Sequence, residues 1–89
     1  MVRKGDVFMT TEMYSVYDVQ CDEYYMENAT LSDLQEDVYL TMQDRSEAHD
    51  DDLGKEYAEF IRKNKPSDIS LSFILSFYRD YEYKVEKII

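Results

Sequence analysis

The sequence contains few of the residues that make tight turns, crosslinks and metal sites. Its 89 residues include two glycines, one proline, one cysteine, one histidine and no tryptophan. A single cysteine excludes a disulfide within the chain, and one cysteine with one histidine is too few for a zinc site. The shortage of glycine and proline favours a few long elements over many short strands.

Long apolar runs are also missing. No segment approaches the length of apolar sequence that a membrane-spanning helix needs, and no signal-peptide core follows the N-terminus. We therefore expect no association with a membrane and a location in the cytoplasm of a bacterial host cell. A chain of this length forms one domain and buries only about 60% of the surface that its unfolded form exposes, so a partner could add stability.

Positive charge is absent from a large part of the chain. Residues 5–44 include ten Asp or Glu and no Lys or Arg. Residues 5–54 carry a net charge of −13 and residues 55–89 carry +1, within a total of −10. A strongly negative segment repels nucleic acid and attracts basic proteins. Solubility is the simpler explanation of an acidic composition, but it accounts less well for a segment of this length without a cation.

Catalytic and metal-binding motifs are not found either. His49 is the sole histidine and lies in a polar, acidic segment, where a solvated loop residue is expected. Cys21 falls on an apolar stripe, which predicts a buried and unreactive thiol. The residues around Gly54 do not match an EF-hand loop, because Leu53 and Phe60 occupy positions that need acidic side chains. We expect a protein that is not an enzyme and that uses no cofactor.

The first eight residues, MVRKGDVF, raise a question about the start of the protein. Lys-Gly-Asp can be encoded by AAA-GGA-GAT, a purine-rich sequence of the kind that binds ribosomes, and Met9 follows after a short spacer. One hypothesis is that Met9 is the biological start and that residues 1–8 are a translated leader. The alternative is a genuine N-terminal arm. In both cases we expect residues 1–8 to be loosely held.

Two interpretations fit residues 11–27. As a helix, the segment places its apolar residues on one face at spacings of three and four. As a strand, its tyrosines, valines and threonines are favourable residues that alternate acceptably. We expect a helix capped by Thr10 or Thr11, because the segment is long for a strand and no glycine, proline or Asn-Gly turn interrupts it. Its apolar face would contain Met13, Val16, Tyr17, Cys21, Tyr24 and Tyr25.

Three later segments show helical patterns. Thr30 is a candidate N-cap, with Asp33 three residues later as an imperfect capping box, and this helix would end near residue 44 or 45. The next helix would end in the cations of residues 62–65, before Pro66. Ser67 would cap the last helix, and residues 80–89 could fray or continue as a strand. The expected buried stripes are Leu31, Leu34, Val38 and Met42; Leu53, Tyr57, Phe60 and Ile61; and Leu71, Ile74, Phe77, Tyr78 and Tyr81.

These patterns predict an all-α fold. It would be a compact bundle of about four short amphipathic helices, forming a single domain over residues 9–89. The alternative is an α+β domain in which residues 7–21 form an antiparallel strand pair.

Acidic and tyrosine side chains are the best candidates for a functional surface. Tyrosine offers a large contact area and a polar tip at low ordering entropy, which suits interfaces, and two adjacent tyrosines cannot both point into a small core. We expect acids of the first two helices to form an anionic face, with two tyrosines as apolar anchors. The predicted partner-binding residues are Asp18, Asp22, Glu23, Tyr24, Tyr25, Glu27, Asp33, Glu36 and Asp37.

The composition resembles that of phage anti-defence proteins, nuclease-immunity proteins and DNA mimics as a class, although no motif identifies a family. The predicted function is a small acidic protein-binding inhibitor of phage or bacterial origin. Its anionic face would dock into the basic nucleic-acid-binding groove of a target enzyme, with carboxylates replacing phosphates. We expect no direct binding of nucleic acid, because the negative field opposes it. The alternative is a homodimeric structural or regulatory interaction module without DNA mimicry.

Overall fold

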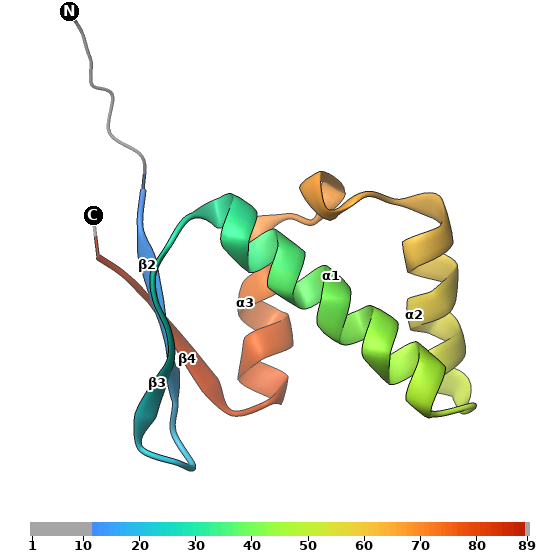
Figure 1. Cartoon of the computed structure of the whole chain (residues 1–89), viewed down its shortest axis with the longest axis horizontal. Coiled ribbons are helices and arrows are strands. Elements are labelled where there is room, and N and C mark those ends of the chain that lie inside the picture. Colours follow the sequence, from blue (N-terminus) through green and yellow to red (C-terminus); the bar gives the residue numbers. More distant parts are fainter. Residues whose placement is uncertain (1–11, 89) are drawn as a thin grey trace, which may run out of the picture.

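Strands and helices both contribute to the fold. The computed structural model describes residues 12–88, and these form a three-stranded antiparallel sheet and three α-helices (Figure 1). The predicted all-α bundle of four helices is therefore wrong, and the fold is α+β. Predictions for residues 1–8 and for a cap at Thr10 or Thr11 lie outside the described residues. In chain order the elements are β2 (Tyr14–Asp18), β3 (Glu23–Ala29), α1 (Leu31–Ala48), α2 (Asp52–Lys63), the short 3₁₀ helix η1 (Pro66–Asp68), α3 (Leu71–Asp80) and β4 (Tyr83–Lys87).

The error concerns residues 11–27, where a β-hairpin replaces the predicted first helix. β2 pairs with β3 on one side and with β4 on the other, both antiparallel. The hairpin turn contains no glycine. Instead, the Asp18 carboxylate accepts the backbone N–H groups of Gln20 and Cys21 at 3.0 and 3.2 Å, and Asp22 adopts a left-handed backbone with φ of 55°. Aspartate makes such turns by bonding nearby backbone and by tolerating positive φ, which is why no glycine signal marked this one.

The α+β alternative has the correct fold class but the wrong strand pair. It placed the pair at residues 7–21, whereas β2 and β3 extend over residues 14–29. β3 is also irregular. Its register against β2 shifts first between Tyr14, which lies opposite Ala29, and Val16, which lies opposite Met26. It shifts again between Val16 and Tyr17. Asn28 has a φ of 54° within the first shift, as expected of an extra residue in a bulge.

The helix that follows the hairpin agrees well with its prediction. Thr30 Oγ1 accepts the backbone N–H of Asp33 at 3.1 Å, and the Asp33 carboxylate accepts the backbone N–H of Thr30 at 2.9 Å. This reciprocal capping box fixes the start of α1. Leu34, Val38 and Met42 of the predicted stripe are fully buried, whereas Leu31 is exposed. Leu53 and Tyr81, which the later stripes predicted to be buried, are exposed as well. α1 then extends to Ala48, a few residues beyond the expected end.

The last helix starts later than predicted. Pro66–Asp68 forms η1, so Ser67 does not cap α3. Ser70 does so instead, because its hydroxyl accepts the backbone N–H of Phe73 at 3.1 Å. β4 follows α3 directly, as the alternating tail of the sequence allowed. Within residues 12–88, no helix combines the length and the apolar character needed to cross a bilayer.

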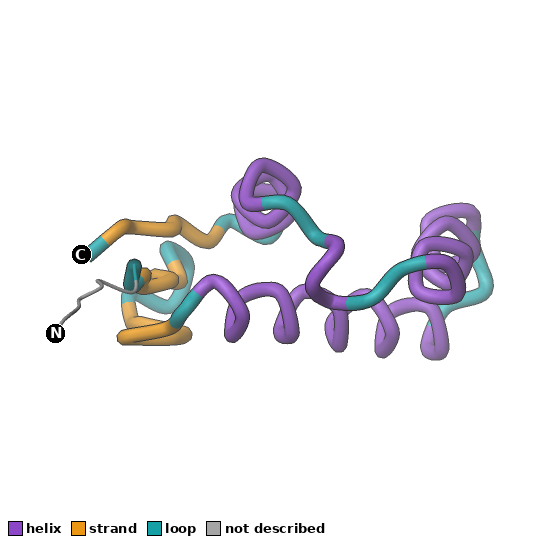
Figure 2. The backbone as a smooth tube through the Cα atoms, turned by 90° about the horizontal axis from the view of Figure 1, so that it is seen from above, coloured by secondary structure: helices purple, strands orange, loops and turns teal. Residues whose placement is uncertain are grey.

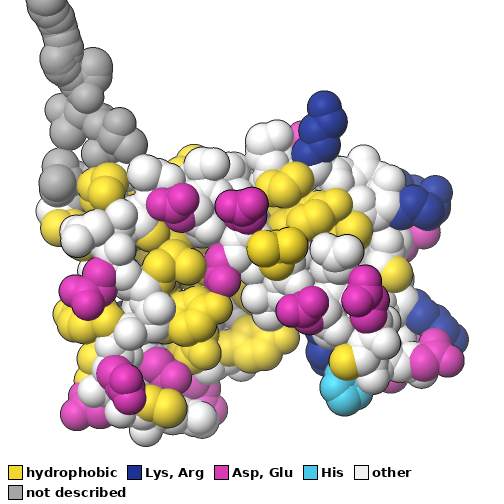
Figure 3. All heavy atoms as spheres, viewed as in Figure 1, with side chains coloured by type: hydrophobic (Ala, Val, Ile, Leu, Met, Phe, Trp, Pro, Cys, Tyr) yellow, Lys and Arg dark blue, Asp and Glu magenta, His cyan; other side chains and the backbone are white. Residues whose placement is uncertain are grey.

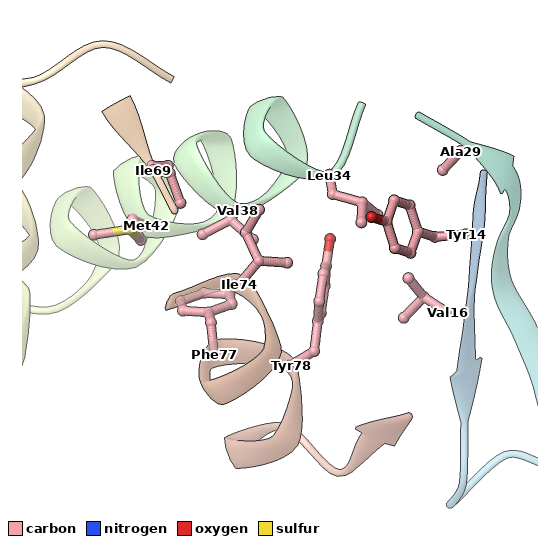
Figure 4. Packing of buried hydrophobic residues seen from close by; sticks show 10 residues of the cluster. All are labelled: Tyr14, Val16, Ala29, Leu34, Val38, Met42, Ile69, Ile74, Phe77 and Tyr78. Atoms are coloured by element: carbon pink, nitrogen blue, oxygen red, sulfur yellow. The ribbon is translucent and has the colours of Figure 1, made fainter. Parts of the chain in front are cut away.

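One apolar core joins the sheet to the helices. Figure 2 shows the sheet at one end of the molecule, with β3 and α1 on one side and β4 and α3 on the other. In Figure 4 the Tyr78 ring extends from α3 between Val16 of β2 and Ile74, and its hydroxyl points toward α1. The buried hydrophobic residues are Tyr14, Val16, Ala29, Leu34, Val38, Met42, Ile69, Ile74, Phe77 and Tyr78.

Candidate partner-binding surface

Three predicted acidic residues lie at the tip of the hairpin. Asp18 ends β2, Asp22 is in the turn and Glu23 begins β3. Asp18 and Glu23 are direct cross-strand partners. Like charges placed opposite each other oppose strand pairing, whereas the hydrogen bonds that the Asp18 carboxylate accepts hold the turn. The hairpin tip thus combines a structural aspartate with further negative charge.

The hairpin tip is also hollowed. A shallow open depression of about 290 Å³, which we call the tip hollow, lies beside these acids. Its lining includes two carboxylates and two phenol rings. The residues that line the tip hollow are Asp18, Cys21, Glu23, Tyr24 and Tyr25.

A second depression lies between the hairpin and the first helix. It has a volume of about 340 Å³, is open to solvent, and is called the β3–α1 hollow here. Four carboxylates surround it, from Glu27 of β3 and from Asp33, Glu36 and Asp37 of α1. Its apolar lining comes from Met26, Ala29 and Leu40. A hollow lined by both apolar and acidic side chains suits a side chain with an aliphatic stem and a cationic head.

The two hollows meet at a hydrogen bond between Tyr25 and Asp37. The Tyr25 hydroxyl donates to Asp37 Oδ1 at 2.8 Å, and the Tyr78 hydroxyl donates to Asp37 Oδ2 at 2.6 Å. The Tyr25 ring also lies 5.0 Å from the ring of Tyr83. The pKa values of the Tyr25 and Tyr78 phenols are raised, chiefly by burial and secondly by the hydrogen bond to Asp37. Both remain neutral donors, and Asp37 links β3, α1 and α3.

None of the seven predicted acids forms an ion pair with Lys or Arg within residues 12–88. The Lys and Arg side chains that form ion pairs there bind other acids. Arg45 binds Asp51 at 2.9 Å, and Glu59 binds both Arg62 and Lys63 on α2. Figure 3 shows Asp and Glu side chains over the sheet and α1, with Lys and Arg near α2. We call the seven acids the anionic surface; they are Asp18, Asp22, Glu23, Glu27, Asp33, Glu36 and Asp37.

Some acids of the anionic surface accept hydrogen bonds from the rest of the protein, and others do not. Asp18, Asp33 and Asp37 hold the hairpin turn, the helix cap and the two tyrosines. Within the described chain, the other four accept no hydrogen bond from a side chain or backbone group, so their oxygens are available to a partner. These four are Asp22, Glu23, Glu27 and Glu36.

The predicted pair of tyrosine anchors is divided between the two faces of the sheet. Tyr24 and Tyr25 are about half exposed, at 49% and 46%. Consecutive strand residues point to opposite faces. The Tyr24 ring packs edge-on against the Tyr17 ring, with 5.2 Å between the ring centroids, whereas Tyr25 faces the helices and contacts Tyr83. Tyr25 is therefore the tyrosine that lies at the junction of the two hollows.

Cys21 and His49 lie in separate parts of the fold. Cys21 is exposed in the hairpin turn, so the prediction of a buried thiol is wrong; it relied on a helical spacing that does not exist. A hydrogen bond to Asp18 raises the pKa of this thiol, which lowers its reactivity at neutral pH. His49 is exposed at the end of α1, as predicted. Within residues 12–88, no group of three potential metal ligands gathers.

The sequence did not predict that Met26 and Leu40 line the β3–α1 hollow. Leu40 lies on α1 outside the predicted stripe and is 50% exposed. Met26 reaches the hollow from β3, close to the register shift, and no residue type in this sequence announces a bulge. An exposed leucine on an otherwise acidic helix face was the one available signal.

Comparisons of the chain with protein-family models, with curated proteins and with solved structures gave no match.

Proposed function

We propose that the protein is a small acidic inhibitor that binds a basic protein through the anionic surface. One observation carries this proposal. Seven carboxylates from the hairpin and from the N-terminal half of α1 line two adjoining hollows or the turn beside them, with no Lys or Arg paired to them within residues 12–88. The expected target is a nucleic-acid-binding enzyme of a bacterial cell, whose basic groove the anionic surface blocks.

The placement of negative charge in the fold supports this proposal. Asp18 and Glu23 repel each other across the hairpin, and the acids around the β3–α1 hollow add to the same negative potential. A cationic partner relieves this repulsion, because its guanidinium or ammonium groups take the place of missing counter-charges. Charge complementarity of this kind accelerates association and weakens as salt is added.

The homodimeric module is the second candidate, and exposed apolar side chains favour it. Leu40, Val19 and Ile88 are each about half exposed, at 50%, 55% and 48%. In a dimer these side chains would be covered, and the charge would serve to keep the assembly in solution. A cluster of carboxylates without counter-charges is less well explained by that function than by a basic partner.

A capture experiment tests the proposed function. The purified protein is immobilised and exposed to nuclease-treated lysate of bacterial cells, and bound proteins are eluted with a salt gradient. Affinity for the captured protein is then measured across ionic strength and with duplex DNA as a competitor. We expect salt-sensitive binding that DNA competes away. Binding that is indifferent to both salt and DNA contradicts the proposal.

Matched variants connect this binding to the anionic surface. The double change Glu27→Gln and Glu36→Gln removes two charges beside the β3–α1 hollow and should weaken binding by at least about tenfold. The control is Glu47→Gln with Glu56→Gln, which removes two exposed charges from the far end of α1 and from α2. An equal effect of the two double variants would mean that overall charge, not this surface, determines binding.

A further inference from the structure

Within residues 12–88, no strand pairs with the outer edge of β3. β3 lies at the end of the sheet, in the order β3-β2-β4. Within residues 12–88, its backbone hydrogen bonds to other elements are those of the ladder with β2. Proteins commonly protect such edges with charged side chains, above all lysine, with proline and with β-bulges. β3, with the sequence EYYMENA, has no lysine or proline; its register shifts and its two glutamates limit pairing, but the glutamates would not oppose a cationic strand. Such an edge can accept an extended segment of another protein as an additional strand.

This edge runs beside both hollows of the anionic surface. β3 supplies Glu23, Tyr24 and Tyr25 to the tip hollow, and its later residues Met26 and Glu27 to the β3–α1 hollow. Figures 1 and 2 together place β3 and α1 on the same side of the molecule, with β2 and β4 behind β3. A segment added along β3 would therefore lie next to the acids of α1.

We infer that the partner binds through an extended basic segment that adds to the sheet along β3, an inference that rests on the proposed function. Charge selects this occupant. Pairing of β3 with a second copy of itself would bring Glu23 and Glu27 of both chains onto one shared ladder, and like charges there oppose pairing. A cationic segment places opposite charges at the same positions.

The geometry of strands also defines the pattern of the partner segment. Alternate residues of a strand face the same side and are about 6.6 Å apart. Basic residues at every second position would therefore face the hollows together. Their aliphatic stems would contact Met26 and Leu40, and their charged ends would reach Glu27 and Glu36.

A peptide titration tests the inference on the intact protein. The probe is a fluorescent peptide of about nine residues that alternates arginine and threonine, long enough to run along β3. The comparison peptide has the same sequence with every backbone nitrogen methylated, which keeps the charge and removes the N–H donors. We expect binding of the first peptide and at least about tenfold weaker binding of the second, because strand addition requires backbone hydrogen bonds. A smaller difference overturns strand addition.

Hydrogen exchange provides a second and independent readout. With the unmodified peptide bound, backbone amides within residues 23–27 should exchange more slowly, while those of α2 should be unchanged. Unchanged exchange along β3 also overturns the inference. Its failure differs from failure of the proposed function. If both peptides bind equally and the Glu27→Gln, Glu36→Gln variant weakens both, the anionic surface still binds a basic partner; if that variant weakens neither, the proposed function fails.

Discussion

At the scale of single residues, Asp37 has the most consequential contacts. Both of its carboxylate oxygens accept tyrosine hydroxyls, one from the half-exposed Tyr25 and one from the buried Tyr78. A carboxylate that accepts hydrogen bonds from two hydroxyl donors is fixed in position. Asp37 therefore contributes to the anionic surface and to the packing of three elements at once.

Removal of the Tyr78 hydroxyl should destabilise the protein. Tyr78→Phe keeps the ring in the core and leaves one Asp37 oxygen without its buried donor, which costs about 1.5–3 kcal/mol for a hydrogen bond to a charged group. Urea unfolding followed by circular dichroism measures the change. The control is Tyr81→Phe, because Tyr81 is 41% exposed and its hydroxyl makes no hydrogen bond within residues 12–88. Equal stability of the two variants would show that the Tyr78 bond contributes nothing.

Alkaline pH tests the same contact without a mutation. The pKa values of Tyr25 and Tyr78 are raised in the folded protein, so the unfolded chain loses these protons first, near pH 10 for ordinary tyrosine. Above that pH the unfolded state binds fewer protons, and the free energy of unfolding therefore falls as pH rises. This fall should be shallower in Tyr78→Phe. A free energy of unfolding that stays constant between pH 9 and pH 12 would contradict the raised pKa values.

At the scale of elements, the start of α2 depends on one glycine. Gly54 follows the N-cap Asp51, whose carboxylate accepts the Gly54 backbone N–H at 2.8 Å. A β-carbon at Gly54 would collide with the backbone oxygen of His49, which ends α1. The absent side chain is thus what allows α1 and α2 to meet in so short a turn.

Gly54→Ala should destabilise the turn between the helices. Helix propensity alone predicts that alanine stabilises α2 by about 1 kcal/mol, whereas the collision with the His49 oxygen is a backbone clash of the kind that costs about 1–3 kcal/mol. The sign of the change in the free energy of unfolding therefore separates the two effects. A more stable Gly54→Ala protein would show that the turn opens without penalty.

The elements also show how far sequence reasoning could reach. α1 was predictable, because Thr30, Asp33 and the stripe of Leu34, Val38 and Met42 give independent signals that agree. The hairpin was not, because residues 11–27 satisfy both periodicities and the turn is formed by aspartate rather than glycine. The pairing of β2 with β4 joins segments far apart in the chain, and local patterns contain no information about such contacts.

At the scale of the whole molecule, the cation-free segment could be found from the sequence, but the arrangement of its acids could not. A charge count finds the segment without cations, but the predicted anionic face of two helices does not exist. Four of its seven acids lie on the hairpin, namely Asp18, Asp22, Glu23 and Glu27. The fold gathers them next to α1 through the bend at Thr30, which the capping box fixes. Asp37 accepts a hydrogen bond from Tyr78 of α3, and no local sequence pattern indicates that contact.

The isolated protein should be a monomer at low salt. Its net charge is −10, and the acids of β3 oppose pairing with a second copy. Sedimentation velocity at low and high ionic strength checks this, with the mass of a single chain expected at low salt. A tight dimer at low salt would favour the homodimeric module instead. Association that begins only at high salt would fit repulsion between the anionic surfaces, since salt screens it.

The central position of β2 has a consequence for how the chain folds during synthesis. β2 emerges from the ribosome before the three helices, whereas its neighbour β4 follows all of them, directly after α3 with its buried Tyr78. Until then β2 has one open edge and an uncovered apolar face, a combination that invites aggregation. The dense negative charge of the nascent hairpin should repel neighbouring chains during that interval.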